Sequence, residues 1–340
     1  MNDQNRREFL RLAGVSALTG LSGLSLPSSK LLAAPTKTSP PETALKGLYD
    51  SLDEVQRKAV CFPWDHIDKR RGLLRTFVAN NWQITDKALI SDFYTKKQRD
   101  IVHDIFKGLI NPTWYDRFVK QFSDDNDGQP WGSQQSIAIF GTPGDDKFEF
   151  VMTGRHQTLR ADGNTESHVA FGGPIFYGHA ADGDTEKANH PGNVFWSQAL
   201  AANSVYKLLE PPQREKALVT GPLPREQAVV FSGAKKEARK GLPVSEMSDD
   251  QKKEMQKVLA ALIEPFRQDD RTEVLECLKK QGGLDACSLA FYKTGDIGQD
   301  GVWDNWRLEG PSFVWYFRGS PHVHVWVNIA DDSAVKTNAG

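Results

Sequence analysis

Long apolar runs, paired cysteines and an excess of basic charge are all missing from this sequence. Because no run of about 18 or more apolar residues occurs, we expect no transmembrane helix. The formal net charge is −2, so nothing indicates a nucleic-acid partner, which would show as a basic excess or stripe. The 340 residues are 39% hydrophobic and 25% charged, which is typical of a globular protein with a sizeable core.

Cysteine is scarce: the chain has three, Cys61, Cys277 and Cys287. None is spaced as C-x-x-C, which excludes zinc-ribbon and thioredoxin motifs. In an oxidising compartment Cys277 and Cys287 could pair across a short loop, and two buried thiols fit the sequence equally well. Cys61 would then remain as a small buried apolar side chain.

The common catalytic signatures are also missing. There is no G-x-S-x-G of a serine hydrolase and no H-E-x-x-H of a zinc protease. There is no G-x-G-x-x-G before a helix, no Walker A loop and no C-x-x-C-H for haem attachment. The carboxylates are too scattered to identify a glycosidase pair.

The N-terminus resembles a twin-arginine signal peptide. Arg6 and Arg7 precede Phe9 and Leu10, and a weakly apolar run and small residues follow up to position 34. This predicts export by the twin-arginine machinery to the periplasm or the medium, without a stable membrane anchor. That route often carries folded proteins already loaded with a cofactor. The alternative is an ordinary amphipathic N-terminal helix.

After a linker at 35–42, the pattern predicts a single α+β domain over 43–340. Its sheet is expected to be mostly antiparallel, built from hairpins with helices packed on it. No internal repeat is evident, and the acidic stretch 124–128 is interpreted as a polar turn. Helical spacing marks 45–59, 95–109, 112–122, 195–209, 248–262 and 272–280, and strands are expected at 136–140, 148–152, 155–160, 288–292, 303–308, 312–317 and 322–329.

The last strand carries two histidines. Side chains alternate between the faces of a strand, so His322, His324 and Trp326 share one face and the intervening valines face the core. His156, on the strand predicted at 155–160, can meet them if both strands share a sheet. Three imidazoles with an open fourth position form a catalytic type of metal site. A single copper or zinc ion suits it, and iron would need an added carboxylate.

Four other residues have weaker claims to this site. His179 or His190, from the glycine- and histidine-rich loop at 166–195, could complete or cover it. Arg155 could hold an anionic substrate or a carboxylate that orients a ligand, or it could be a surface arginine. Trp326 could wall the site or pack on its neighbours. For the whole cluster, the alternative is a polar sheet face with solvated histidines.

Several segments resemble the bacterial family known as domain of unknown function 3500. They are Phe140-Gly141-Thr142-Pro143, Gly154-Arg155-His156, Leu159, Asp162-Gly163, Pro174-Ile175-Phe176-Tyr177-Gly178, Gly310-Pro311-Ser312-Phe313 and His322-Val323-His324 with Trp326. Where the family has Gly-His-His, this chain has Arg155 at the first histidine, so only His156 carries over. The Trp also comes early and the family's acidic-aromatic-glycine tail is missing, which indicates a divergent member. The resemblance implies a site but no reaction.

Three functions follow from these observations. The first is an exported, histidine-ligated metal-dependent enzyme, an oxidoreductase or a hydrolase, acting on a small substrate that lies against the loop at 166–195. The second is a non-catalytic periplasmic protein that binds a metal or a small molecule. The third is a structural or interaction protein with an incidental histidine face. Whether the chain is an enzyme stays open at this level.

Overall fold

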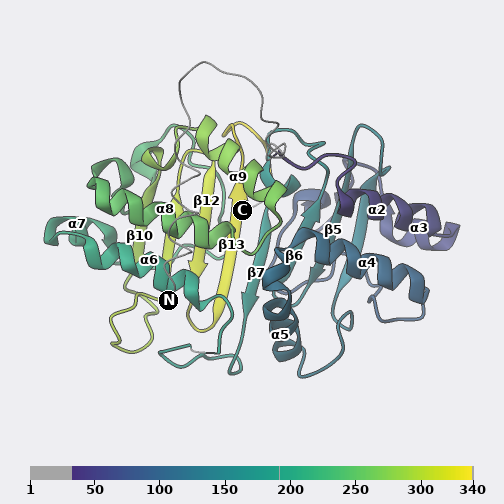
Figure 1. The fold of residues 1–340 in the computed structure, drawn as a ribbon, viewed down its shortest axis with the longest axis horizontal. Helices are drawn as coiled ribbons and strands as arrows, with labels where there is room; N and C mark the ends of the chain where they lie inside the picture. The colour runs from purple at the N-terminus through teal and green to yellow at the C-terminus, as the bar shows by residue number, and fades with distance from the viewer. Residues whose placement is uncertain (1–32, 191, 339–340) are drawn as a thin grey trace, which may run out of the picture. The chain divides into compact units, whose positions relative to one another are not determined.

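The computed structural model describes residues 33–190 and 192–338, and from Ala33 onward the chain forms one compact unit (Figure 1). The residues of the predicted signal peptide, Arg6, Arg7, Phe9 and Leu10, lie outside the described residues, so export stays a prediction. Among the described residues, no helix has both the length and the apolar character needed to cross a membrane.

An 11-stranded sheet runs through the unit, in the order β1-β4-β5-β6-β7-β13-β12-β11-β10-β8, with β9 beside β10. Neighbouring strands are antiparallel except for β1 with β4 and β8 with β10. The predicted α+β class with a mostly antiparallel sheet is therefore confirmed. The strands are β1 Cys61–Phe62, β4 Ser136–Gly141, β5 Phe148–Gly154, β6 Gln157–Ala161, β7 Ile175–His179, β8 Leu218–Val219, β9 Leu242–Pro243, β10 Ser288–Tyr292, β11 Asn305–Glu309, β12 Phe313–Arg318 and β13 Val323–Ile329; β2 Ile67–Asp68 and β3 Gly72–Leu73 form a separate hairpin.

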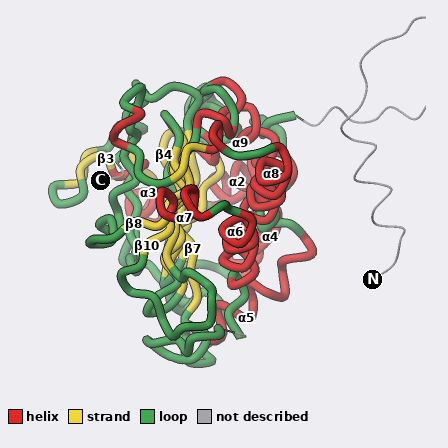
Figure 2. Tube along the Cα trace, turned by 90° about the vertical axis from the view of Figure 1, so that its left-hand side faces the viewer, coloured by secondary structure: helices red, strands yellow, loops and turns green. Residues whose placement is uncertain are grey.

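Most of the helices cover one face of the sheet. Figure 2 shows α2, α4, α5, α6, α8 and α9 gathered on one side of the strands, and the main apolar core lies between the two layers. The opposite face is covered by loops, with smaller clusters around Trp82 and around Trp326. The helices are α2 Pro40–Ser51, α3 Glu54–Val60, α4 Lys96–Leu109, α5 Tyr115–Asp125, α6 Trp196–Leu208, α7 Pro211–Ala217, α8 Asp249–Ile263 and α9 Gln268–Lys280.

Near the N-terminal end, the predicted helix at 45–59 is two helices. It divides at Asp53, whose side chain accepts a hydrogen bond from Gln56 N–H and so caps α3. The first of the two begins at Pro40, where the proline ring pre-sets a helical φ, so residues 40–42 of the expected linker are its first turn.

Two further differences bear on the histidines. The strand expected at 155–160 starts only at Gln157, because Arg155 and His156 form the turn between β5 and β6. The segment at 166–195, expected as a loop, contains β7 in the middle of the sheet. Its five residues are all buried, so they lack the alternation that marks a half-exposed strand.

Cys277 and Cys287 are free and buried, and so they are thiols rather than a disulfide. Burial, the largest influence on both, raises the pKa of each thiol to about 12. Cys61 is also free and is half-buried. These thiols are therefore protonated at neutral pH and pack as small apolar side chains.

The chain also contains a structural repeat. In each half, a helix pair leads into a two-residue strand (α2-α3-β1, then α6-α7-β8), and a second pair precedes a four-stranded antiparallel run (α4-α5-β4-β5-β6-β7, then α8-α9-β10-β11-β12-β13). The short strand pairs in parallel with the first strand of its own run. The strand order is therefore the same from either edge of the sheet, and the halves join where β7 pairs with β13.

Side-chain hydrogen bonds follow the same repeat. In the first half, Gln56 and Gln98, each the third residue of a capped helix, bond to each other at 3.0 Å. In the second half, Gln213 and Gln251 hold the same positions and bond at 3.1 Å. The absence of a repeat, expected from the sequence, is thus overturned at the level of structure.

Candidate metal centre

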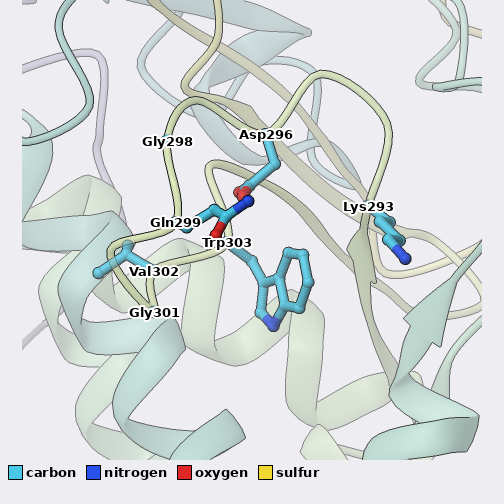
Figure 3. Close-up of a pocket in the computed structure, with 7 residues that line it drawn as sticks. All are labelled: Lys293, Asp296, Gly298, Gln299, Gly301, Val302 and Trp303. Atoms are coloured by element: carbon cyan, nitrogen blue, oxygen red, sulfur yellow. The ribbon is translucent and has the colours of Figure 1, made fainter.

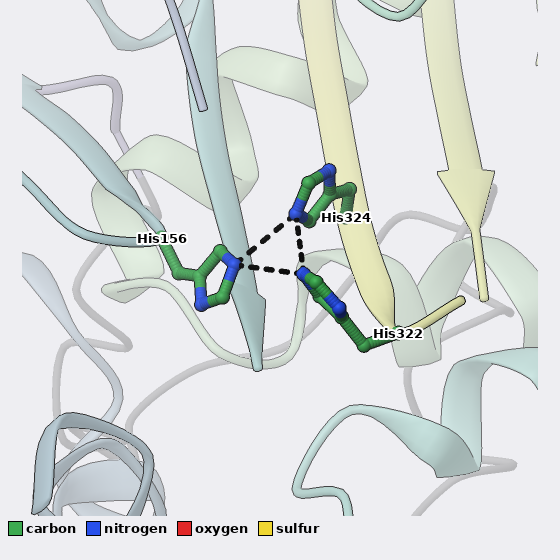
Figure 4. Close-up of side chains that lie close together, drawn as sticks. All are labelled: His156, His322 and His324. Atoms are coloured by element: carbon green, nitrogen blue, oxygen red, sulfur yellow. Dashed lines mark hydrogen bonds between the residues drawn. The ribbon is translucent and has the colours of Figure 1, made fainter. Parts of the chain in front are cut away.

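Three histidines from both halves meet at the junction of the repeat. His156 lies in the turn between β5 and β6, His322 directly precedes β13, and His324 is on β13. Their Nε2 atoms converge, as Figure 4 shows. The Nε2 atom of His156 is 3.2 Å from that of His322 and 3.1 Å from that of His324, and the latter two are 2.9 Å apart.

The backbone around His156 brings its ring to this point. His156 has a φ of 53°, in the left-handed region that few side chains adopt, and two hydrogen bonds fix it there. Its N–H donates to Asn80 O, and its carbonyl accepts from Gly178 N–H on β7. The turn is therefore tied to the strand that separates β6 from β13.

Gly178 provides the space under the rings. A Cβ atom there would lie 2.3 Å from the carbonyl oxygen of Val323 and 3.3–3.4 Å from ring carbons of His156 and His324. Only glycine lets β7 and β13 pair at this position while two imidazoles pass over the strand.

Each ring has an oxygen beside its other nitrogen. Nδ1 of His156 lies 2.9 Å from Asp125 Oδ2, and Nδ1 of His324 lies 2.9 Å from Glu226 Oε2. Nδ1 of His322 lies 2.9 Å from the carbonyl oxygen of Asp184. These oxygens place the proton of each neutral ring on Nδ1, which leaves three Nε2 lone pairs facing one another. Such a group of acceptors is mutually repulsive unless a cation lies among them.

Burial favours the neutral form of two of these rings. It is the largest influence on both His322 and His324, lowering the pKa of each, to about 3 for His324. For Glu226, burial acts to raise the pKa, but the hydrogen bond from His324 and the positive charge of Arg318 lower it overall. For Asp125, burial also acts to raise the pKa, but hydrogen bonds from His156, Gln121 and the Ala180 N–H lower it overall. At neutral pH, the neutral imidazole of His324 is thus backed by the ionised carboxylate of Glu226.

The spacing of the three nitrogens suits one ion. With metal–nitrogen distances of about 2.1 Å, these separations correspond to angles of about 90–100° at the ion. The three ligands would occupy one side of it. In the described part of the chain, no further His, Cys, Asp or Glu joins the group. His156 and His324 are each 4% exposed, whereas His322 is half-buried, so the group is more open on the His322 side.

His179 and His190 lie apart from this group. The Nε2 atom of His179 is 2.9 Å from Asp124 Oδ2, and its Nδ1 accepts a hydrogen bond from Val194 N–H. His190 is buried against Trp196, with ring centroids 4.1 Å apart. Burial lowers the pKa of both histidines.

Arg155 and Trp326 lie close to the group without joining it. The Arg155 guanidinium is 3.4 Å from Asp184 Oδ1, and the carbonyl of Asp184 is the one that faces His322. Trp326 packs on Phe176 at 4.4 Å, and Phe176 in turn lies 5.3 Å from the ring of His324. Arg155 thus contacts the residue that orients a histidine, and Trp326 is one ring removed.

The residues that orient the histidines were not predicted from the sequence. Asp125 ends α5 rather than lying in the polar turn expected at 124–128, and Asp184 and Glu226 are in loops. An acidic residue after an amphipathic helix is a signal too common to single out Asp125. No periodicity marks the other two.

Two hollows border the group. The first, of about 470 Å³, is lined by Asn80, Leu223, Pro224, Arg225, Glu226, Gln227 and Arg318. The second, of about 390 Å³, is lined by Asp124, Asp127, Arg155, Ala180, Ala181, Gly183 and Asp184. A third, of about 500 Å³, lies in the loop between β10 and β11 near Asp296 and Trp303 (Figure 3). The first two hollows include residues beside the histidines, Glu226 and Asp184, whereas the loop hollow includes neither, so it is a separate feature.

Comparisons with known proteins identify a family. A family model described as "Protein of unknown function (DUF3500)" matches residues 36–328, and so covers most of the chain. No curated protein and no solved structure matched the chain.

Proposed function

We propose that this chain, which belongs to the DUF3500 family of proteins of unknown function, is a metal-dependent enzyme with one ion held by His156, His322 and His324. The proposal depends on one observation above all. Three Nε2 atoms lie within 3.2 Å of one another while each Nδ1 faces an oxygen at 2.9 Å. Oriented histidines of this kind are what metal sites use.

Zinc and copper fit this donor set best. Both accept three imidazoles and keep a position open for water or substrate. Non-haem iron usually adds a carboxylate, and none of the described carboxylates joins the group. Held on one side only, the ion would activate water for a hydrolase or dioxygen for an oxidoreductase, acting on a small substrate.

The protein groups around the ligands have separate tasks in this proposal. Asp125 and Glu226 hold the rings of His156 and His324 in place and raise the basicity of their Nε2 atoms. Arg155 fixes the Asp184 segment whose carbonyl orients His322. We expect the ion to be loaded before export by the predicted twin-arginine route.

A non-catalytic protein that binds a metal or small molecule in the periplasm would use the same groups. The two proposals share the metal and differ in turnover. A screen of hydrolytic and oxidative reactions on metal-loaded protein separates them, and Cu(II) would add an electron paramagnetic resonance signal that zinc lacks.

Elemental analysis of protein purified without a histidine tag tests the metal. We expect about one ion per chain, and loss of that ion in His324→Ala. His168→Ala is the matched control, because His168 also faces a carboxylate, Asp331, but lies outside the group. A metal-free wild type, or an ion that His324→Ala retains, would contradict the proposal.

A further inference from the structure

We propose that the hollow beside Arg225 and Arg318 binds an oxyanion, a carboxylate or a phosphate group carried by the small substrate. The inference deepens the proposed function, and it rests on that function for the claim that the bound molecule is a substrate. Its binding step can be tested whether or not an ion is present. Three features of the hollow carry it: the position of Arg318, the free charge of Arg225 and the contrast with the second hollow.

Arg318 stands directly beside a proposed ligand. It is the cross-strand partner of His324 in the pairing of β12 with β13, on the same face of the sheet. The Cβ atoms of such partners lie about 4.5–5.5 Å apart. Its guanidinium pairs with Glu226, while its buried Nε has no hydrogen-bond partner among the described residues. Arg318 lines the hollow and thus brings a positive charge next to the histidine group.

Arg225 adds a second positive charge. It is exposed and forms no ion pair within the described part of the chain. The side-chain amide of Gln227 lines the same hollow and can donate hydrogen bonds, while that of Asn80 already donates to Glu226 at 3.4 Å. The one carboxylate there, Glu226, is already engaged by His324 and Arg318. The hollow therefore has unused donors and no unused acceptor of full charge, which suits an oxyanion.

The second hollow has the opposite character. Asp124, Asp127 and Asp184 line it, against the single cation Arg155. An anion approaching the histidine group is therefore repelled on one side and attracted on the other. About 470 Å³ is enough for a small molecule. We infer a substrate whose anionic group is anchored at the arginines and whose reacting atom lies toward the Nε2 atoms.

Calorimetric titration at constant ionic strength tests this inference. Inorganic phosphate and acetate are added separately to the full-length protein, both as purified and after removal of metal by a chelator. We expect saturable binding of at least one anion in both forms, and the better of the two identifies the oxyanion. Arg225→Gln should weaken it at least 10-fold, and Arg225→Lys should recover part of it.

The control is Arg70→Gln, because Arg70 is exposed and lines neither hollow. Binding unchanged in Arg225→Gln, an equal loss in Arg70→Gln, or no binding of either anion would overturn the inference. The metal proposal is judged apart, from the ion content of His324→Ala. Anion binding by a wild-type protein that carries no ion when purified would support the anion site and contradict the metal-dependent enzyme.

Discussion

The two halves of the repeat place a turn at the same point of the sheet, with different side chains in it. In the first half, Arg155-His156 joins β5 to β6, and in the second, Gly310-Pro311-Ser312 joins β11 to β12. The carbonyl of His156 accepts from Gly178 N–H, and that of Ser312 accepts from Ala330 N–H. The hydrogen bond between turn and strand is therefore common to both halves, whereas the positive φ and the imidazole belong to His156 alone.

The helix that precedes each turn shows the same contrast. Asp125, at the end of α5, faces Nδ1 of His156, whereas Gln281, just after α9, accepts a hydrogen bond from Ser312 N–H. One residue earlier, Asp124 pairs with His179, and Lys280 pairs with Asp331 with the charges reversed. The tie between helix and sheet is kept in both halves, with different chemistry.

The other two histidines also have no counterpart. Gly178 and Ala330 hold equivalent places in the two halves. Counting back from them along each chain segment, the positions that match His322 and His324 are Ala170 and Gly172. Because the second half folds with Ser312 in place of His156, and the first half folds with Ala170 and Gly172 in place of His322 and His324, the fold itself does not require the histidines. Their meeting at the junction is thus a property of one site, which is the pattern expected of function rather than of stability.

The largest effect is expected from closing the space under the rings. Gly178→Ala places a methyl group 2.3 Å from the Val323 carbonyl, so we expect destabilisation of about 1–3 kcal/mol and loss of the bound ion. Chemical unfolding and elemental analysis measure the two effects. The counterpart Ala330→Gly should lower stability by about 1 kcal/mol and keep the ion. An ion retained by Gly178→Ala would argue against the site.

A second prediction concerns Asp162, which holds the position in the first half that Arg318 holds in the second. Burial, aided by the charge of Glu149, raises the pKa of Asp162 to about 7. The unfolded carboxyl ionises near its ordinary value of 3.8, so between these values the folded state binds more protons. Stability should therefore fall by a few kcal/mol as pH rises from about 4 to 7.

Asp162→Asn should remove this slope, and unfolding in urea at several pH values measures it. The low pKa of His324 acts in the opposite sense, since stability from that ring is lost as pH falls below about 6.5. The difference between wild type and Asp162→Asn isolates the carboxyl. Parallel curves for the two proteins would show that Asp162 is ionised in the fold.

A smaller effect is expected from the residue that orients His156. Asp125→Asn keeps the shape of the side chain but removes its charge, so metal affinity should fall about 10–100-fold with little change in stability. Competition with a chelator gives the affinity. Gln281→Ala, at the matching place in the other half, should leave metal affinity unchanged. A similar loss in both variants would mean that the effect is structural.

The smallest effect is expected at the turn of the second half. Ser312 Oγ donates to the Ala330 carbonyl at 2.8 Å, so Ser312→Ala should cost about 1 kcal/mol and leave the ion in place. Thermal unfolding and elemental analysis measure both quantities. Loss of the ion here would show that the halves are coupled beyond the junction.

Strand alternation was enough to predict that His322 and His324 would share a face and meet His156. It placed His156 on a strand face, however, because a turn with a positive φ has no signal in side-chain pattern. β7 was missed because both its faces are buried and its residues do not alternate. The repeat was missed because the two halves share strand pairing and capping glutamines. Neither feature changes the spacing of hydrophobic residues along the sequence.

The group draws one histidine from the first half of the chain and two from the second, across the pairing of β7 with β13. An ion bound there would link the two halves across this strand pairing. A ligand that binds only the folded form stabilises it by a free energy that rises with the logarithm of the ligand concentration. The concentration of metal would therefore set how often the pairing of β7 with β13 opens. The rates of proteolysis and hydrogen exchange along β7 and β13 would then depend on the metal concentration, even where the rest of the fold does not respond to it.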